Sequence, residues 1–109
     1  MYAVARVNSF DETKLAQAGE SLREFDELHA AQPGFLGSIT ADLGGGRRLV
    51  LNVWRSPEDA EAGLSVLGPE VGRLLAPLMS APSELIGNGT IISSDFALSP
   101  DEPQAGLRG

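Results

Sequence analysis

The segment between residues 32 and 63 constrains the fold of this chain more than any other. It reads Gln-Pro-Gly-Phe-Leu-Gly, then two short apolar runs separated by three consecutive glycines, and then Asn-Val-Trp-Arg-Ser-Pro-Glu-Asp-Ala. The Pro-Gly pair favours the end of a helix, and the three glycines allow the positive φ angles of a tight β-hairpin. Ser56, followed by Pro57 and two acidic residues, is typical of a helix start. The segment therefore predicts a helix end, a β-hairpin and a new helix.

The size and charge of the chain limit what it is expected to do. With 109 residues, 42% of them hydrophobic, it is long enough for one domain, and a domain this small gains from pairing, so we expect a homodimer. It has no cysteine and one histidine, too few ligands for a His/Cys metal site, so no metal is expected. A formal charge of -7 with scattered basic residues disfavours nucleic-acid binding.

The two ends of the chain have distinct compositions. The first eight residues, Met-Tyr-Ala-Val-Ala-Arg-Val-Asn, are too short and too strand-like for a signal peptide. No apolar run reaches the length of a membrane span, so we expect a cytoplasmic protein that does not bind membranes. The residues after Ser99 are rich in Pro, Gly and charge and have no period. We therefore predict one domain over residues 1–98 and a flexible tail over residues 99–109.

Period-two alternation predicts three strands in the first half of the chain, over residues 2–8, 35–43 and 47–55. Each strand has one apolar face, such as Ala3, Ala5 and Val7 in the first, and one mixed face. If the apolar faces pack against helices, the mixed faces gather on the opposite surface of the sheet. That surface would then carry six candidate side chains, namely Arg6, Asn8, Ser38, Thr40, Asn52 and Trp54.

Apolar residues at helical spacing predict a first helix that ends near Ala31. Ser9 and Glu12 have the spacing of a capping box, which places the start of this helix at Ser9. The apolar stripe consists of Leu15, Ala18, Leu22, Phe25 and Leu28.

A second helical region is expected from Pro57 to about Met79, and the pair Gly68-Pro69 is expected to break it in two. Pro82 should close the helical part. The final strand is then predicted within residues 84–98, with a bulge or bend at Gly87-Asn88-Gly89.

The predicted order is strand, helix, strand, strand, helix, strand. This is the α+β, ferredoxin-like βαββαβ arrangement, an antiparallel sheet with both helices on one face. The other face must be covered in so small a protein, and a second copy of the sheet would cover it. We therefore expect a dimeric α+β barrel that encloses the mixed faces in a cavity.

Residues 33–37 read Pro-Gly-Phe-Leu-Gly, and residues 54–58 read Trp-Arg-Ser-Pro-Glu. These motifs resemble the antibiotic biosynthesis monooxygenase family of dimeric α+β barrels. Its members carry a Pro-Gly-Phe-x-Gly turn before the second strand and a third strand ending in Trp-x-Ser before an acidic helix start. The resemblance spans roughly residues 2–96. It implies the fold more strongly than a reaction, because members of this fold differ in chemistry.

In the cofactor-independent monooxygenases of this family, a phenol or hydroquinone is deprotonated and its anion reacts directly with dioxygen. The resemblance thus implies a monooxygenase without a cofactor, acting on a phenolic, quinol or polycyclic aromatic substrate. By position, Trp54 matches the family tryptophan, and Asn8 matches the asparagine of the haem-degrading branch. Asn52 is a second amide on the face of Trp54. These three are the expected catalytic residues, and the expected substrate contacts are Arg6, Ser38 and Thr40.

The chain also departs from the family pattern. Haem-degrading relatives place an iron-ligating histidine on the second helix, but residues 57–81 contain no His, Tyr or Cys, so haem degradation is not expected. The same segment lacks the tyrosine that serves as acid or base in some quinone-forming members. Asp42 and Glu70 are acidic candidates by position alone. The sequence therefore identifies no proton acceptor.

Each candidate also has a purely structural explanation. A lone tryptophan at a strand end, such as Trp54, often fills a core or a dimer contact. Asn8 can shape the turn into the helix, and Asn52 and Arg6 can pair across strands. His29, near the end of the first helix, can interact with the helix dipole without catalysing anything.

Two other functions stay open at this point. A non-catalytic dimer of the same fold would bind a small apolar ligand or a partner, and an isomerase or cyclase would act on a related substrate. A cavity with two amides near Trp54 would favour the monooxygenase. A barrel closed by Trp54, Leu36 and Val50 would favour the non-catalytic dimer.

Overall fold

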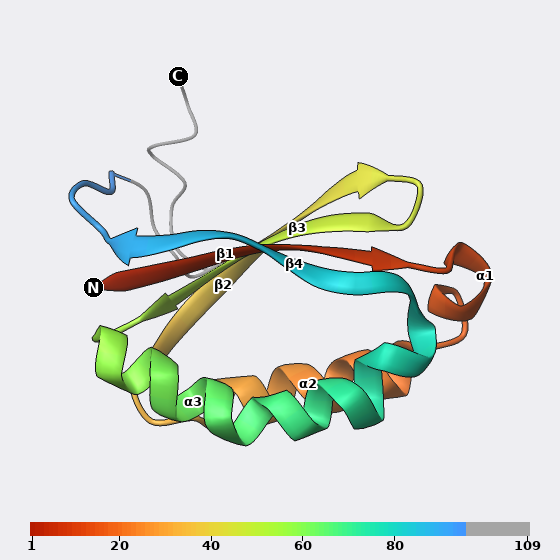
Figure 1. Cartoon of the computed structure of the whole chain (residues 1–109), viewed down its shortest axis with the longest axis horizontal. Coiled ribbons are helices and arrows are strands. Elements are labelled where there is room, and N and C mark those ends of the chain that lie inside the picture. Colours follow the sequence, from red (N-terminus) through yellow and green to blue (C-terminus); the bar gives the residue numbers. More distant parts are fainter. Residues whose placement is uncertain (96–109) are drawn as a thin grey trace.

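The structure, a computed structural model, describes residues 1–95. Four strands form one antiparallel sheet in the order β2-β3-β1-β4. The strands are β1 (Tyr2–Phe10), β2 (Phe35–Gly44), β3 (Arg47–Trp54) and β4 (Met79–Thr90). Two helices, α2 (Gly19–Ala30) and α3 (Pro57–Glu70), run along one face of this sheet (Figure 1). The predicted ferredoxin-like α+β fold is confirmed.

Three short helical elements complete the described part of the chain. The single turn α1 (Glu12–Leu15) follows β1, and α3 continues into a π-helical turn, η1 (Val71–Leu75), and a 3₁₀ turn, η2 (Ala76–Leu78). Among residues 1–95, no helix combines the length and the apolar character needed to cross a membrane. The predicted boundary at residue 98 and the predicted tail lie outside the described residues.

The hairpin between β2 and β3 forms where the glycines predict it. Gly44, Gly45 and Gly46 have φ angles of 85°, 65° and 81°, which side-chain-bearing residues rarely adopt. The carbonyl of Gly46 also accepts a 2.8 Å hydrogen bond from the backbone N–H of Phe10. A β-carbon at residue 46 would overlap that Phe10 carbonyl oxygen, so glycine is required here for space as well as for conformation.

The faces of the sheet are the reverse of the prediction. Val4 and Trp54, from the mixed face, are 3% and 1% exposed and pack with Ala60 and Leu67 of α3. The mixed face therefore meets the helices, and the face of Ala3 and Ala5 points away from them. The prediction failed because alanines are too small to fill the space under a helix, whereas valine and tryptophan of the mixed face fill it.

The first helix begins later than the sequence suggested. Ser9 belongs to β1 and pairs with Arg47 and Ala81, so the predicted capping box is wrong. The cap is Asp11, whose carboxylate accepts a 3.1 Å hydrogen bond from the backbone N–H of Lys14. The helical region is then interrupted after α1. Pairing on both sides extends β1 to Phe10, and this leaves Ser9 unable to act as a cap.

The predicted break at Gly68-Pro69 is also wrong, because both residues lie within α3. The irregularity comes shortly after them, in the π-helical turn η1. There the hydrogen bonds join residues five apart instead of four, whereas a proline lacks the N–H that the α-helical pattern needs. Pro82 lies inside β4, an edge strand where a missing N–H is tolerated. The helical part therefore ends at Leu78, ahead of this proline.

The final strand begins earlier than expected, at Met79 instead of residue 84, and it ends at Thr90. The predicted continuation at residues 96–98 lies outside the described residues. Opposite β1 its register shifts between Gly87 and Leu85, which leaves Ile86 as the extra residue. The predicted bulge at residues 87–89 is therefore one residue too late.

Candidate functional site

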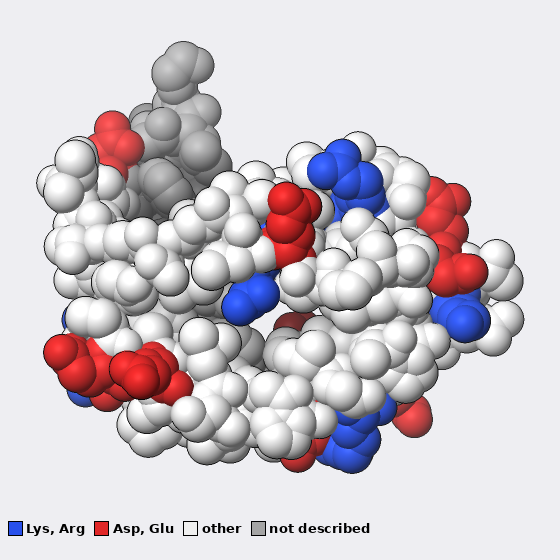
Figure 2. Space-filling model, in the orientation of Figure 1, with Lys and Arg blue, Asp and Glu red and all other residues white. Residues whose placement is uncertain are grey.

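A cavity of about 780 Å³ lies between the mixed face of the sheet and the helices α2 and α3. Figure 2 shows a hollow between the sheet and the helices, with basic and acidic side chains near its edge. The cavity lies within a single chain, so the predicted enclosure of the mixed faces by a second sheet is wrong. The helices cover that face themselves.

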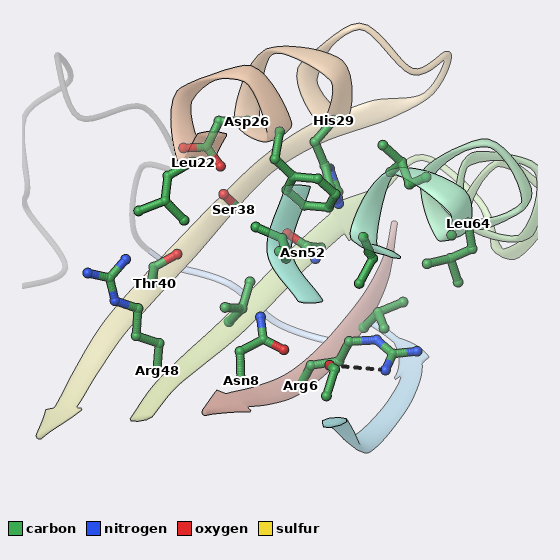
Figure 3. A pocket seen from close by; sticks show the side chains of 18 of the residues that line it. Arg6, Asn8, Leu22, Asp26, His29, Ser38, Thr40, Arg48, Asn52 and Leu64 are labelled. Carbon is green, nitrogen blue, oxygen red and sulfur yellow. Dashed lines mark hydrogen bonds between the residues drawn. The ribbon is translucent and has the colours of Figure 1, made fainter. Parts of the chain in front are cut away.

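All six residues that the sequence placed on one surface line this cavity. Arg6 and Asn8 come from β1, Asn52 and Trp54 from β3, and the hydroxyls of Ser38 and Thr40 from β2 (Figure 3). The strand register explains the grouping, because Asn52 pairs with Val4 on one side and with Ser38 on the other. Residues paired across an antiparallel sheet share a face.

Aromatic rings form one end of the cavity. His29 of α2 lies among Phe25, Phe35 and Trp54, with ring centroids 5.7 Å, 4.5 Å and 5.4 Å away, respectively. Burial lowers the pKa of His29 to about 4, so its imidazole is neutral at pH 7. Trp54 is 1% exposed and packs in the core as well as against the cavity.

The amide side chains lie on the sheet side. The Oδ1 atom of Asn8 is buried and has no hydrogen-bond partner within the described residues, and the same holds for Nδ1 of His29. Unpaired buried polar atoms are uncommon and costly, by about 1–3 kcal/mol each. Two of them, on residues from opposite walls of one cavity, are typical of a place where a bound molecule supplies the missing partners.

Asp26 of α2 is an acidic lining residue that the sequence analysis did not single out. It lies on α2 and lines the cavity together with Leu22 and Ser38 (Figure 3). Partial burial raises the pKa of Asp26, and the positive charge of Arg48 opposes that rise. The signal was present in the sequence, because Asp26 and His29 follow Leu22 at spacings of four and seven residues, on the apolar stripe of the helix.

The acidic residues that the sequence did suggest lie elsewhere. Asp42 caps the hairpin, where its carboxylate accepts a 2.8 Å hydrogen bond from the backbone N–H of Gly44. Glu70 forms an ion pair with Arg73, 2.7 Å long, and Arg73 also pairs with Glu24. Neither Asp42 nor Glu70 lines the cavity.

The described residues contain no group of three or more His, Asp or Glu side chains close enough to hold a metal ion. Haem iron is commonly held by a His, Cys or Tyr side chain, and α3, η1 and η2 carry none of these. His29 comes from the other helix and is enclosed by aromatic rings. The lining residues therefore do not fit a haem held from α3.

No protein-family model matches this sequence, and no curated protein matches it. Solved structures do match the fold. SnoaB, a cofactor-independent oxygenase from Streptomyces nogalater, is 16% identical with a TM-score of 0.68, over 85% of this chain and 94% of that one. An antibiotic biosynthesis monooxygenase is 11% identical with a TM-score of 0.69, over 85% of this chain and 100% of that one.

MhuD, in a structure with two manganese protoporphyrin IX molecules bound per active site, is 15% identical with a TM-score of 0.67. That match covers 89% of this chain and 100% of MhuD. These identities are too low to carry an activity from one protein to another, but the similarity of the backbones is extensive. The chain therefore has the fold of the antibiotic biosynthesis monooxygenase family.

Proposed function

We propose that this protein is a cofactor-independent monooxygenase acting on a phenolic, quinol or polycyclic aromatic substrate. The observation that carries the proposal is the cavity, which combines aromatic and aliphatic walls with two amides, Asn52 close to Trp54 on β3 and Asn8 further along β1. Its volume of about 780 Å³ suits a fused-ring molecule. Trp54 does not close the cavity together with Leu36, which is 41% exposed, so the arrangement expected of a filled barrel is absent from the described residues. The cofactor-independent oxygenase SnoaB, which shares the fold, supports the proposal.

The reaction we propose starts with a phenol whose ring system contains an activated methylene carbon. Loss of one proton gives an anion, which transfers electrons to dioxygen and forms a carbon–oxygen bond. The resulting hydroperoxide loses water, so the methylene becomes a carbonyl, one oxygen atom stays in the product and the other leaves as water. Dioxygen is the oxidant and the substrate is the reductant, so the balance needs no flavin or metal.

The lining residues have separate roles in this scheme. Asn52 donates its amide N–H to the phenolate oxygen, where a preorganised donor stabilises developing charge, and Asn8, further along the sheet, donates to a second oxygen of the substrate. Asp26 accepts the proton, since its raised pKa makes it a stronger base than an aspartate with the ordinary pKa. Trp54 packs against the ring system. The polar substituents of the substrate contact Arg6, Ser38 and Thr40.

We propose that two copies pair through the face of the sheet that the helices do not cover. Ile39 and Leu49 on this face are each 37% exposed. An apolar sheet face open to water is costly, and a second copy of the same face buries it.

We also propose that the protein is cytoplasmic, an expectation that comes from the sequence.

The proposal is tested by measuring oxygen uptake by the purified, chelator-treated protein with each of a panel of hydroquinones and anthrone-type phenols as substrate. Asn8→Leu and Asn52→Leu should each reduce uptake at least tenfold, because they remove amide donors. Asn8→Leu should leave stability nearly unchanged or raise it, since the buried Oδ1 has no partner to lose. Uptake no faster than the uncatalysed reaction, with binding of the same compounds retained, would favour the non-catalytic ligand-binding protein instead.

A further inference from the structure

Arg6 places a positive charge inside a largely apolar cavity. It lies on β1, is partly buried, and extends toward β4, where its Nη1 donates a hydrogen bond to Oγ of Ser83 (Figure 3). At 3.4 Å this bond is long. A guanidinium has five N–H donors, and within residues 1–95 this is the one side-chain hydrogen bond that Arg6 makes. Most of its donors are therefore free for a ligand.

The charges around Arg6 do not balance. The cavity is lined by two arginines, Arg6 and Arg48, and by one carboxylate, that of Asp26. Arg48 acts electrostatically on Asp26, and its guanidinium carbon lies 5.8 Å from the centre of the Phe10 ring. Among the described residues, Arg6 has no carboxylate partner, because both ion pairs belong to Arg73. The cavity therefore has an excess positive charge in a chain whose net charge is -7.

A guanidinium that is partly buried beside apolar walls is stabilised when an anion pairs with it. The partner that suits one guanidinium best is a carboxylate, which accepts two parallel N–H bonds and carries one negative charge. A phosphate dianion would leave one charge without compensation in the same place. The apolar remainder of the cavity, with Phe25, Phe35 and Trp54 at one end, suits a planar ring system.

We propose that the substrate is an aromatic acid, a fused-ring compound with a carboxylate, and that Arg6 binds this carboxylate. This inference rests on the proposed function for the aromatic part of the substrate, and it adds the acidic group. It makes Arg6 the residue that selects acids over neutral molecules of the same shape.

Binding without turnover tests the inference separately from catalysis. Trp54 is the only tryptophan in the chain and lines the cavity, so its fluorescence should be quenched by an aromatic ligand. The probes are anthracenecarboxylate and the neutral anthracenemethanol, titrated into the full chain under nitrogen. The acid should bind at least about tenfold more tightly, the difference expected from a charge-assisted hydrogen bond.

Three variants assign that preference to Arg6. Arg6→Gln should abolish the preference for the acid probe. Arg6→Lys keeps the positive charge and should retain part of this preference. The matched control is Arg47→Gln, which removes the same charge from an exposed residue that does not line the cavity and should keep the full preference. Thermal unfolding of each variant checks that it folds.

Equal affinity for the two probes in the unmodified protein, or failure of both to bind, would overturn the inference. A preference that persists in Arg6→Gln would overturn the role of Arg6. If the acid preference is found but no phenol is oxidised, the proposed monooxygenase fails and the inferred acid site stands. If neutral phenols are oxidised and no acid preference exists, the proposed monooxygenase stands and the inferred acid site fails.

Discussion

Gly63 of α3 lies directly against the indole of Trp54, so close that a β-carbon at residue 63 would overlap the six-membered ring. Trp54 is held there by burial, at 1% exposed, together with Val4 and Leu67. The contact fixes the distance between β3 and α3 at one end of the cavity. The width of the cavity at this end thus depends on the absence of a single methyl group.

Gly63→Ala should therefore destabilise the fold by about 1–3 kcal/mol, although alanine normally favours a helix over glycine. Urea unfolding followed by Trp54 fluorescence measures this. The matched control is Gly72→Ala, in the turn η1, where a β-carbon meets no atom within 4 Å. Equal stability of the two variants would show that the indole does not pack as described.

Stability should depend on pH through His29. Its pKa is about 4 in the folded protein and near 6.5 when unfolded, so between these values the unfolded chain holds more protons. The contribution is fully present above pH 6.5 and is lost as the pH falls to 4, by about 3 kcal/mol in total. Unfolding measured from pH 7 down to pH 4 should show the loss, and His29→Leu should reduce it. The same slope in that variant would mean that other groups cause it.

Asp26 should control the rate of the proposed reaction. Its ionised form accepts the proton, so activity should fall as the pH drops through its raised pKa. Asp26→Asn should lower kcat about a hundredfold or more with little change in KM, and the acid limb of the pH profile should disappear. Glu27→Gln is the control, because the neighbouring Glu27 does not line the cavity. An unchanged acid limb in Asp26→Asn would assign the proton to another group.

Charge on the uncovered face of the sheet should separate the proposed dimer. Ile39→Glu places a carboxylate on the surface that two copies would share, and burying two such charges is unfavourable. Light scattering after size exclusion should give the mass of a dimer for the unmodified protein and of a monomer for the variant. Val66→Glu, on an exposed position of α3, should stay dimeric. A monomeric unmodified protein contradicts the pairing.

Much of the architecture could be predicted because it depends on local patterns. The glycines at 44–46, the alternation in three strands and the helix start at Ser56 have direct structural causes, and the structure has all of them. The six predicted cavity residues also come together, since strand period and register alone place them on one face.

What could not be predicted depends on which face each helix covers. Small apolar residues such as Ala3 look like a packing surface in sequence, but the helices lie over the larger side chains Val4 and Trp54 instead. That choice also hid Asp26, which belongs to the apolar stripe by spacing but not by residue type, and it hid the fact that His29 faces a cavity. A polar residue on such a stripe can be recognised as a site residue only once a cavity is known to lie beneath it.

Oxygen isotope labelling tests the central claim most directly. The purified, chelator-treated protein would be given an anthrone-type phenol under dioxygen enriched in the heavy isotope, and the product analysed by mass spectrometry. A cofactor-independent monooxygenase predicts one labelled oxygen atom in each product molecule, one dioxygen consumed per product, and at least tenfold slower turnover in Asn52→Leu. Product oxygen that comes from water, or labelling no faster than without protein, would contradict it.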